Sequence, residues 1–502
     1  MAEYDLAVIG GGINGTGIAR DAAGRGLRVL LLEQSDLAAG TSSASTKLIH
    51  GGLRYLEHGW FSLVRQALAE REVLMAMAPH LIRPLRFVLP HEPGTRRPFW
   101  VLRSGLFIYD HLGGRKFLPA TRTINLARDP LGAPLAGRYR RGFEYSDCRT
   151  DDARLVVLNA IDAAERGAAI RTRTRCIGAE RSEIWRLVLE SRGRRDIASA
   201  RVLVNATGPW AGIFGETVLH RPAPPELRLD QGTHIVVRRL FEHDCGYVFQ
   251  AFDGRVVFAL PFEVDFTLVG TTDHSFSGDP GLVSPTAEET SYLCAVINDH
   301  FRTRISTADV VWSFSGLRAL HQEGSSKPQD TPRDYVLALD AGGAEAPLLT
   351  VYGGKLTTYR RLAEDALNRL APLLGTTRPA WTRRSRLPGG NIPINGVERL
   401  LEQTRASWPF LTESHARRLV VSYGTRVERI LGSAKDLNDL GPVLGADLTG
   451  AEVRYLMAHE WAQTEDDVLW RRSKLGLKFS RAERHRLGRF IADAIGIVSR
   501  DW

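Results

Sequence analysis

The first 33 residues place the strongest restriction on how this chain can fold. Tyr4 to Ile9 is a short apolar run typical of a buried parallel strand, and residues 28–33 form a second one. Between them lie a glycine-rich turn and a small-residue helical segment, which Gly24 and Gly26 end. This order predicts a strand–helix–strand unit. Because parallel strands need a crossover between them, we expect an α/β fold.

The turn carries the spacing Gly10-x-Gly12-x-x-Gly15. The first glycine of such a turn permits the tight bend, the second lets the backbone approach a pyrophosphate, and the third lets the helix pack closely on the sheet. The helix N-terminus then faces the phosphates with the positive end of its dipole. Glu33 closes the second strand about 20 residues on, where a carboxylate can bind a ribose hydroxyl. The pattern predicts a dinucleotide site, and a turn without a ligand is the weaker alternative.

Two later segments favour FAD over a nicotinamide cofactor. The sequence Asn205-Ala-Thr-Gly208 ends an apolar strand, and Gly353-Gly354 precedes a helical pattern that contains Thr357. The N-terminus of that helix would point at the pyrimidine edge of a flavin, where its dipole stabilises the negative charge of the reduced ring. Either segment alone could be an ordinary strand-to-helix turn. Together they favour FAD.

Length and composition bound the remaining possibilities. A chain of 502 residues is too long for one core, so two or three domains are expected. The net charge of +9 suits an anionic substrate, an anionic membrane or nucleic acid, or simply a solvated basic surface. An acidic N-terminus and the lack of an apolar run of roughly 18 residues argue against a secretory signal and a membrane span. Four scattered cysteines fit neither a disulfide framework nor structural zinc: Cys148, Cys176, Cys245 and Cys294.

We expect three domains. A Rossmann-like FAD-binding domain is discontinuous and takes residues 1–80, 145–230 and 310–386. An antiparallel-sheet substrate-binding domain takes 81–144 and 231–309, because 231–275 alternates apolar and polar residues. Residues 81–144 are rich in Pro, Gly and Arg and are expected to include loops. Beyond a linker at 387–391, an all-helical domain takes 391–502, with capping boxes that begin at Thr449 and Ser480.

Several long strings resemble the aerobic, FAD-dependent glycerol-3-phosphate dehydrogenases, and the match extends over nearly the whole chain. These strings are more specific than the glycine motif, which many flavoproteins share. They are GTSSASTKLIHGGLRYLEHG at 40–59, GFEYSDCRTDDARLV at 142–156, VNATGPWA at 204–211, LVGTTD at 268–273, FSGLRAL at 314–320 and VYGGKLTTYRRLAEDAL at 351–367.

The resemblance implies that the chain binds FAD non-covalently, oxidises sn-glycerol 3-phosphate to dihydroxyacetone phosphate by hydride transfer to flavin N5, and passes the electrons to membrane quinone. It also implies a cytoplasmic protein on the inner face of the cell membrane and a possible homodimer. No calcium loop is present, so no metal is predicted. The predicted cofactor-binding residues are Gly10, Gly12, Ile13, Asn14, Gly15, Glu33, Thr41, Ser42, Ser43, Ser45, Lys47, Leu48, His50, Thr207, Gly208, Gly354, Lys355, Leu356 and Thr357.

The family's substrate pocket carries over onto Arg54, Tyr55, His234, Thr271, Arg318 and Lys355. A phosphomonoester carries close to two negative charges, and guanidinium groups bind it bidentately, so Arg54 and Arg318 are the expected phosphate ligands, helped by Tyr55. The C2 hydroxyl must lose a proton, for which we expect His234 as the base. Lys355 is the alternative base or holds the C2 oxygen. The alternative for His234 is a purely structural role at the start of a strand.

Three other functions fit parts of the sequence. A glycerol-3-phosphate oxidase would reduce the flavin in the same way but would pass the electrons to oxygen. An amine or amino-acid oxidase needs only one cationic side chain, to bind a substrate carboxylate. The positive charge of Lys355 would repel an amine substrate. A tRNA-binding flavoprotein would explain the basic charge, but no RNA module or basic stripe is visible, so no nucleic acid is expected. Separately, residues 359–374 form an amphipathic pattern that could enter an anionic leaflet, although packing on the core is favoured.

Overall fold

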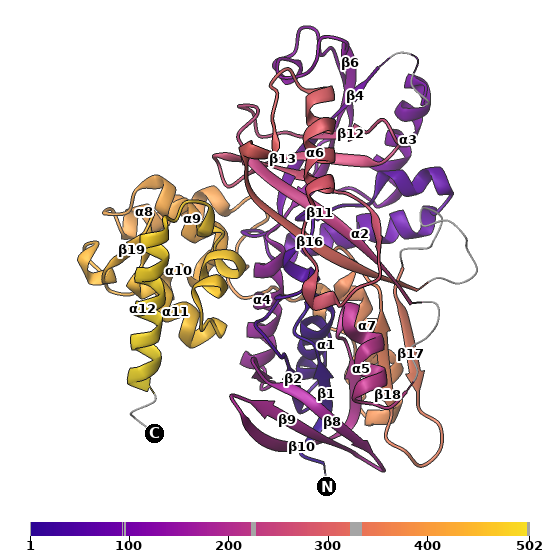
Figure 1. Ribbon diagram of the computed structural model, residues 1–502, viewed down its shortest axis with the longest axis vertical. Helices are drawn as coiled ribbons and strands as arrows, with labels where there is room; N and C mark the ends of the chain where they lie inside the picture. The colour runs from indigo at the N-terminus through magenta and orange to yellow at the C-terminus, as the bar shows by residue number, and fades with distance from the viewer. Residues whose placement is uncertain (1, 93, 95–96, 222–226, 322–333, 499–502) are drawn as a thin grey trace.

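The computed structural model describes residues 2–92, 94, 97–221, 227–321 and 334–498 and contains two large sheets and a helical C-terminal part (Figure 1). The first sheet has eight strands, with β1 near its centre in the order β17-β18-β10-β1-β2-β7, and β8 and β9 extend it from β10. Its strands are β1 (Tyr4–Ile9), β2 (Val29–Leu32), β7 (Ala169–Arg171), β8 (Arg175–Arg181), β9 (Trp185–Ser191), β10 (Arg194–Asn205), β17 (Val336–Asp340) and β18 (Leu348–Tyr352).

The two faces of this sheet are buried by different layers. Helices α1 (Ile13–Gly24), α4 (Asp152–Glu165) and α7 (Tyr359–Leu374) cover the face that carries Leu6 and Val8. The other face, with Ala7 and Ile9, packs against the β8–β9 hairpin and the short helix α5 (Ala211–Thr217). Since successive side chains of a strand point to opposite faces, a continuous apolar run such as β1 is suited to this double burial.

The second sheet has ten strands in the order β15-β11-β14-β13-β12-β4-β6-β3, with β16 paired to β11 and β5 to β6. Helix α6 (Ala287–His300) covers one face, and α2 (Phe61–Met77) and α3 (Phe99–Leu112) cover the other. The strands are β3 (Leu48–Ile49), β4 (Arg83–His91), β5 (Arg122–Ile124), β6 (Arg141–Arg149), β11 (Leu227–Arg238), β12 (Gly246–Gln250), β13 (Val256–Phe262), β14 (Phe266–Gly270), β15 (His274–Phe276) and β16 (Val310–His321).

The C-terminal part has its own apolar core and consists mainly of helices: α8 (Val397–Ser407), α9 (Glu413–Tyr423), α10 (Val427–Leu431), α11 (Gly450–Glu460) and α12 (Arg481–Val498). Ser480 and Glu483 form the reciprocal cap expected before α12. At Thr449 only half of the expected box forms, because the Glu452 carboxylate binds Arg418 instead. A short hairpin of β19 (Val443–Gly445) and β20 (Leu448–Thr449) also departs from the all-helical expectation.

The expected fold class is confirmed, and the elements of the first 33 residues begin and end within a residue or so of the predicted positions. The loops expected within 81–144 are present between the elements, but β4, α3, β5 and the start of β6 lie there as well. The prolines and glycines that suggested loops do not prevent β4 from pairing with β6 and β12, which hold it on both sides. Strands β6 and β16 belong to the second sheet, although 145–230 and 310–386 were assigned to the FAD-binding domain. The domain boundaries stay a prediction.

The amphipathic helix α7 does not present its apolar face outward. Its apolar side chains lie in the core of the first sheet, and the helix packs against α1: Leu362, Ala363, Ala366, Leu367 and Leu370 are all buried. The favoured expectation of core packing is confirmed, and α7 is not a membrane surface. In the described part of the chain, no helix is both long and apolar enough to cross a bilayer.

Candidate functional site

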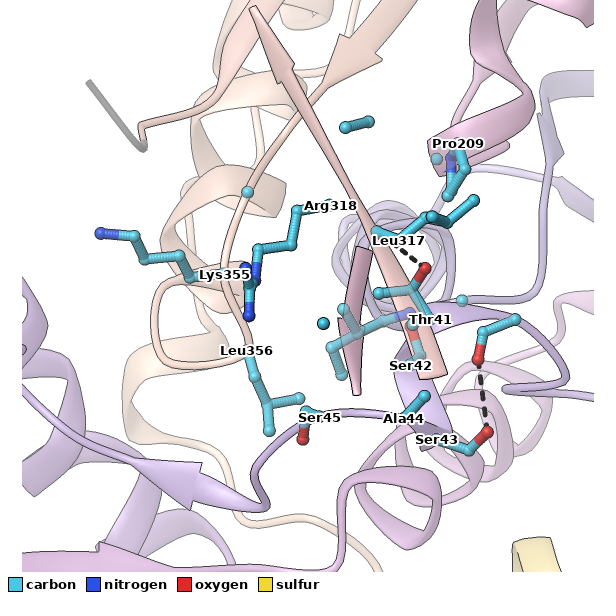
Figure 2. A pocket seen from close by; sticks show the side chains of 18 of the residues that line it. Thr41, Ser42, Ser43, Ala44, Ser45, Pro209, Leu317, Arg318, Lys355 and Leu356 are labelled. Carbon is cyan, nitrogen blue, oxygen red and sulfur yellow. Dashed lines mark hydrogen bonds between the residues drawn. The ribbon is translucent and has the colours of Figure 1, made fainter. Parts of the chain in front are cut away.

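A cavity of about 1300 Å³ lies where the first sheet meets the second. Its walls come from the glycine turn after β1, residues 39–58, the end of β10, strands β11 and β16, and the loop after β18. Figure 2 shows part of this wall, with Thr41–Ser45 on one segment and Arg318 and Lys355 on others. Segments that are distant in the sequence therefore surround one space.

The glycine turn can adopt its shape only with glycine at two positions. Gly10 has φ +113°, and a Cβ there would lie 2.5 Å from the carbonyl oxygen of Ala206. A Cβ on Gly15 would lie 1.9 Å from the carbonyl oxygen of Gly10. Gly15 therefore allows α1 to approach the turn, and it does not line the cavity itself. The residues of the turn that do line it are Gly10, Gly12, Ile13 and Asn14.

Glu33 follows β2 and closes the turn from the side. Its carboxylate accepts hydrogen bonds from the backbone N–H of Gly11 and of Ser35, both at 2.7 Å. Burial raises the pKa of this carboxyl, while the two backbone donors act in the opposite direction. Glu33 lines the cavity, as the predicted contact with a ribose requires.

The hydroxyl-rich segment is held in place by its own side chains. The Thr41 hydroxyl donates to the carbonyl of Leu317 at 2.7 Å (Figure 2). The Ser45 hydroxyl donates to Asp152 at 2.7 Å. The Ser42 hydroxyl accepts from the backbone N–H of Ile13 at 3.0 Å. The segment thus joins β16, α4 and the start of α1, and Thr41, Ser42, Ser43 and Ser45 all line the cavity.

Lys47 does not line the cavity, contrary to its predicted contact with the cofactor. Its ammonium group is buried and pairs with Asp152 at 2.8 Å, and it also donates to the carbonyl of Ser43 at 2.9 Å. Burial lowers the pKa of this amine. The sequence pattern could not show which way the side chain turns. Lys47 fixes the hydroxyl-rich segment from behind, while its neighbours Leu48 and His50 line the cavity.

The loop after β18 forms the opposite wall. Gly353 and Gly354 have φ of +73° and +98°. The Asn14 side chain donates to the carbonyl of Gly353 at 3.0 Å, whereas its buried Oδ1 has no hydrogen-bond partner among the described residues. The Thr357 hydroxyl accepts a hydrogen bond from the backbone N–H of His50 and donates one to its carbonyl oxygen. The predicted residues of this wall and of the end of β10 all line the cavity: Gly354, Lys355, Leu356, Thr357, Thr207 and Gly208.

The six predicted substrate residues also meet in this cavity: Arg54, Tyr55, His234, Thr271, Arg318 and Lys355. Arg54 and Tyr55 lie on the 3₁₀ turn η2 (Leu53–His58). The Lys355 ammonium lies 4.1 Å from the centre of the Tyr55 ring. Arg318 pairs with Asp273 at 2.8 Å and lies 3.4 Å from the Thr271 hydroxyl.

His234 is 2% exposed, and two neighbours hold its ring. Its Nε2 lies 2.9 Å from the Thr46 hydroxyl, and the ring stacks on Phe314 with centroids 5.0 Å apart. Its Nδ1 has no hydrogen-bond partner within the described residues. Burial, and then the positive charges of Lys47 and Arg318, lower the pKa of this imidazole well below 6.5. His234 is therefore neutral at pH 7, and it is a weaker base than an exposed imidazole.

Sequence reasoning missed several residues of the cavity wall. Thr46 and Asp273 lie inside the strings that carried the family resemblance, so those strings held a signal for both. Trp470 and Arg471 belong to the π-helical turn η10 (Asp467–Arg472) of the C-terminal part. Trp470 stacks on Trp312 with centroids 4.4 Å apart. No local pattern could have predicted that contact, because the two residues are far apart in the chain.

Two parts of the chain match known protein families. Residues 5–360 match the family of FAD dependent oxidoreductases, and residues 380–493 match the C-terminal domain of alpha-glycerophosphate oxidase. The chain belongs to this family of FAD-dependent oxidoreductases. These matches confirm both the expected cofactor, FAD, and the resemblance described above.

Individual relatives of the flavoprotein are similar over nearly their whole length. A glycerol-3-phosphate dehydrogenase of Pseudomonas aeruginosa is 54% identical, and the match covers 98% of this chain and 96% of that protein. A D-erythritol 1-phosphate dehydrogenase of Brucella abortus is 47% identical, with 96% and 97% covered. The X-ray structure of a glycerol-3-phosphate dehydrogenase from Bacillus halodurans, complexed with FAD, has a TM-score of 0.76 at 26% identity and covers 99% of this chain and 92% of that one.

The cavity of the flavoprotein fits FAD at both ends. At the first turn, Gly10 and Gly12 line the cavity with backbone alone, beside the N-terminus of α1. At the loop after β18, the buried Oδ1 of Asn14 offers an acceptor that nothing else in the described residues uses. Leaving such an atom unpaired costs about 1–3 kcal/mol, so a bound donor there is favourable.

Proposed function

We propose that this flavoprotein oxidises sn-glycerol 3-phosphate to dihydroxyacetone phosphate and delivers the electrons to a membrane quinone. One observation carries the proposal: a neutral, buried histidine and several cationic side chains, among them Arg54, Arg318 and Lys355, line the same cavity as the FAD-binding turn. An anionic polyol needs the cations for binding, and its oxidation needs a base. The two close relatives, both named as dehydrogenases of phosphorylated polyols, support the same reading.

The substrate phosphate binds to Arg318 and Arg54, with the Tyr55 hydroxyl beside them. Arg318 is partly buried and pairs with the Asp273 carboxylate at 2.8 Å, and this pairing supports a role for the guanidinium in binding an anion. A dianionic phosphate is a better partner than a single carboxylate, because it offers more acceptor oxygens to the guanidinium fork. Asp273 keeps the arginine in place before substrate enters.

The C2 hydroxyl gives its proton to His234. His234 lines the cavity, and the Thr46 hydroxyl contact at Nε2 holds its ring in place. The Phe314 ring fixes the plane of the imidazole. Lys355 lies in the same cavity and binds the C2 oxygen, and it is the alternative base. FAD, when bound, supplies the hydride acceptor that the oxidation of an alcohol requires.

The finer parts of the proposal concern the acceptor and the location. We place the protein in the cytoplasm, on the inner face of the cell membrane, as a possible homodimer. Its net charge of +9 favours an anionic membrane surface. Because both relatives are named dehydrogenases, an acceptor other than oxygen is favoured over the oxidase alternative. The cluster of Arg54, Arg318 and Lys355 would oppose an amine substrate, which disfavours an amine oxidase.

D-erythritol 1-phosphate is a second candidate substrate. The relative that acts on it is 47% identical over 96% of this chain, so the same phosphate and base residues would serve. The fourth carbon of this polyol needs only additional room at the end of the substrate away from the phosphate. Both substrates therefore belong in the first experiment.

The test is anaerobic mixing of the holoenzyme with sn-glycerol 3-phosphate and, separately, with D-erythritol 1-phosphate, while the flavin absorbance is followed. Rapid bleaching with sn-glycerol 3-phosphate is expected. A flavin that stays yellow with both compounds would overturn the proposal, and bleaching by D-erythritol 1-phosphate alone would replace the substrate. Peroxide release under air, measured in parallel, distinguishes the oxidase alternative.

A further inference from the structure

The C-terminal part has a core of its own, yet it reaches the FAD cavity at the π-helical turn η10. Three of its residues line the cavity: Asp466, Trp470 and Arg471. Arg471 pairs with Asp36 at 2.6 Å, three residues after Glu33. Burial raises the pKa of the Glu33 carboxyl, and the nearby positive charge of Arg471 acts in the opposite direction. Because Glu33 is the predicted contact with a ribose, η10 lies at the nucleotide end of the cavity.

Two loops of the first sheet form the walls at this end. Residues 33–39 follow β2, and residues 172–174 connect β7 to β8. Glu33 of the first loop and Thr174 of the second both line the cavity, and the backbone N–H of Thr174 donates to the carbonyl of Glu33 at 2.9 Å. The position of these loops therefore sets the shape of the nucleotide end.

The turn η10 holds both loops through buried ion pairs. Asp467 is 0% exposed and pairs with Arg173 of the second loop at 2.6 Å, while Arg472 pairs with Asp36 of the first loop at 2.8 Å. Burial acts to raise the pKa of Asp467, but the backbone N–H of Gln463 and the nearby arginines lower it to about 2, so this carboxylate stays ionised. Breaking a buried pair leaves an uncompensated charge, and η10 and the loops therefore hold one another in place.

Arg471 has hydrogen-bonding capacity that these ion pairs do not use. Its Nε donates to Asp36 and its Nη2 to Asp467, whereas its Nη1 donates to no group in the described ranges of the chain. The glycine turn at the same end, residues 10–15, contains no cationic side chain. The diphosphate of FAD is anionic, and a guanidinium group is well suited to bind phosphate oxygens. Arg471 can therefore supply the positive charge that the glycine turn does not.

We propose that η10 is an FAD-binding element of the C-terminal part, which closes the cavity around the ADP half of the cofactor. Arg471 binds an anionic oxygen of that half, and Asp467 and Arg472 fix the loops that surround it. The C-terminal part thereby retains the cofactor. This inference rests on FAD binding and not on the proposed substrate or electron acceptor, and its test uses neither.

The test measures the rate at which the holoenzyme releases FAD, followed by flavin fluorescence after dilution. Arg471→Gln should speed release by about tenfold or more, the effect of losing one hydrogen bond to a charged group. Arg471→Lys should recover part of this loss, because it keeps the charge without the guanidinium fork. The matched control is Arg426→Gln. Arg426 also joins the C-terminal part to the first sheet's helices, through Glu165 at 2.7 Å, but it does not line the cavity, so release should be unchanged.

Several outcomes would overturn the proposal. One is release at the wild-type rate from Arg471→Gln. Another is equal acceleration by Arg426→Gln, since any loosening of the C-terminal part would then have the same effect. The flavin still bound to Arg471→Gln should keep the wild-type visible spectrum, and a shifted spectrum would contradict a contact with the ADP half.

A measurement on the wild type applies if Arg471→Gln does not fold. Hydrogen exchange is compared between the full-length chain stripped of flavin and the same chain reloaded with FAD. FAD should slow exchange of the backbone amides in residues 463–474, which include η10, and should leave residues 481–498 of α12 unchanged. Equal exchange of residues 463–474 in both forms would overturn the proposal.

Discussion

His234 is a residue whose chemistry follows from its surroundings. Burial and two nearby cations keep its pKa well below 6.5, so the imidazole stays neutral as the pH falls from 8 to 6.5. We expect the rate of anaerobic flavin reduction to be flat over that window. His234→Asn should lower this rate about 10²- to 10⁴-fold, the usual contribution of a general base. Reduction by dithionite, which needs no base, should be unaffected.

The same experiment distinguishes the two candidate bases. If Lys355 accepts the proton, Lys355→Met should lower the reduction rate more than His234→Asn does. If His234 accepts it, Lys355→Met should mainly raise the apparent KM. A rate that neither substitution lowers would remove both residues from the proton transfer.

Arg318 makes a separate prediction about binding. Arg318→Ala should raise the apparent KM for sn-glycerol 3-phosphate by about 10- to 150-fold, since a hydrogen bond to a charged group contributes about 1.5–3 kcal/mol. FAD absorbance should be unchanged, because Arg318 is not expected to hold the cofactor. Arg318→Lys should recover part of the loss through charge alone. An unchanged KM would exclude Arg318 from the phosphate site.

Among the elements, the approach of α1 to the first sheet depends on one atom. A Cβ at position 15 would lie 1.9 Å from the carbonyl oxygen of Gly10, and a backbone atom cannot move aside easily. Gly15→Ala is therefore expected to displace the start of α1 and to give a colourless protein. Gly105→Ala in α3 is the matched control, because its added Cβ would meet no described atom within 4 Å. A yellow Gly15→Ala protein with full FAD content would contradict this account.

The π-helical turn η10 joins the C-terminal part to the first sheet through buried charges. Arg472 is 0% exposed and binds Asp36 at 2.8 Å, and it also donates to the carbonyl of Glu460. Asp36→Ala would leave this buried guanidinium with only the more distant Glu460 carboxylate, at 3.7 Å, and is expected to cost about 3 kcal/mol in the free energy of unfolding. The exposed pair Arg417–Glu398 is the control: Glu398→Ala should cost about 0–1 kcal/mol. Urea unfolding measures both.

At the scale of the whole molecule, buried histidines predict how stability depends on pH. His80 lies next to Gly389 of the linker and Gly424 of the C-terminal part, and burial with two neighbouring arginines lowers its pKa to about 3. The unfolded chain binds this proton near pH 6.5, whereas the folded protein does not bind it until the pH approaches 3. Stability should therefore fall as the pH drops below 6.5.

Replacing His80 tests that account. His80→Leu should make the fall in unfolding free energy between pH 6 and 4 shallower by about 1.4 kcal/mol per pH unit, which corresponds to one proton. Urea unfolding at several pH values measures the slope. A slope equal to that of the wild type would mean that His80 does not remain neutral in the folded protein.

The sequence by itself determined the strand–helix–strand start, the FAD-binding turn and the family. These features depend on interactions within about one helical turn or between adjacent residues, such as the glycines that allow the turn after β1. They also depend on the spacing of apolar residues along the sequence, which indicates that a segment has an apolar face. Most of the predicted cavity residues followed from these local strings, and the structure does bring them together.

Only the tertiary structure decided which way side chains and faces turn. Pairing of β11 with β16 brings His234 against Phe314, while Lys47, in the middle of a cofactor-like string, turns to Asp152 instead. Helix α7 has the stronger amphipathic pattern, yet its apolar face is buried, whereas α3 leaves Trp100 and Phe107 exposed. Hydrophobic period shows that a face will avoid water, but what covers that face depends on packing between segments far apart in the chain.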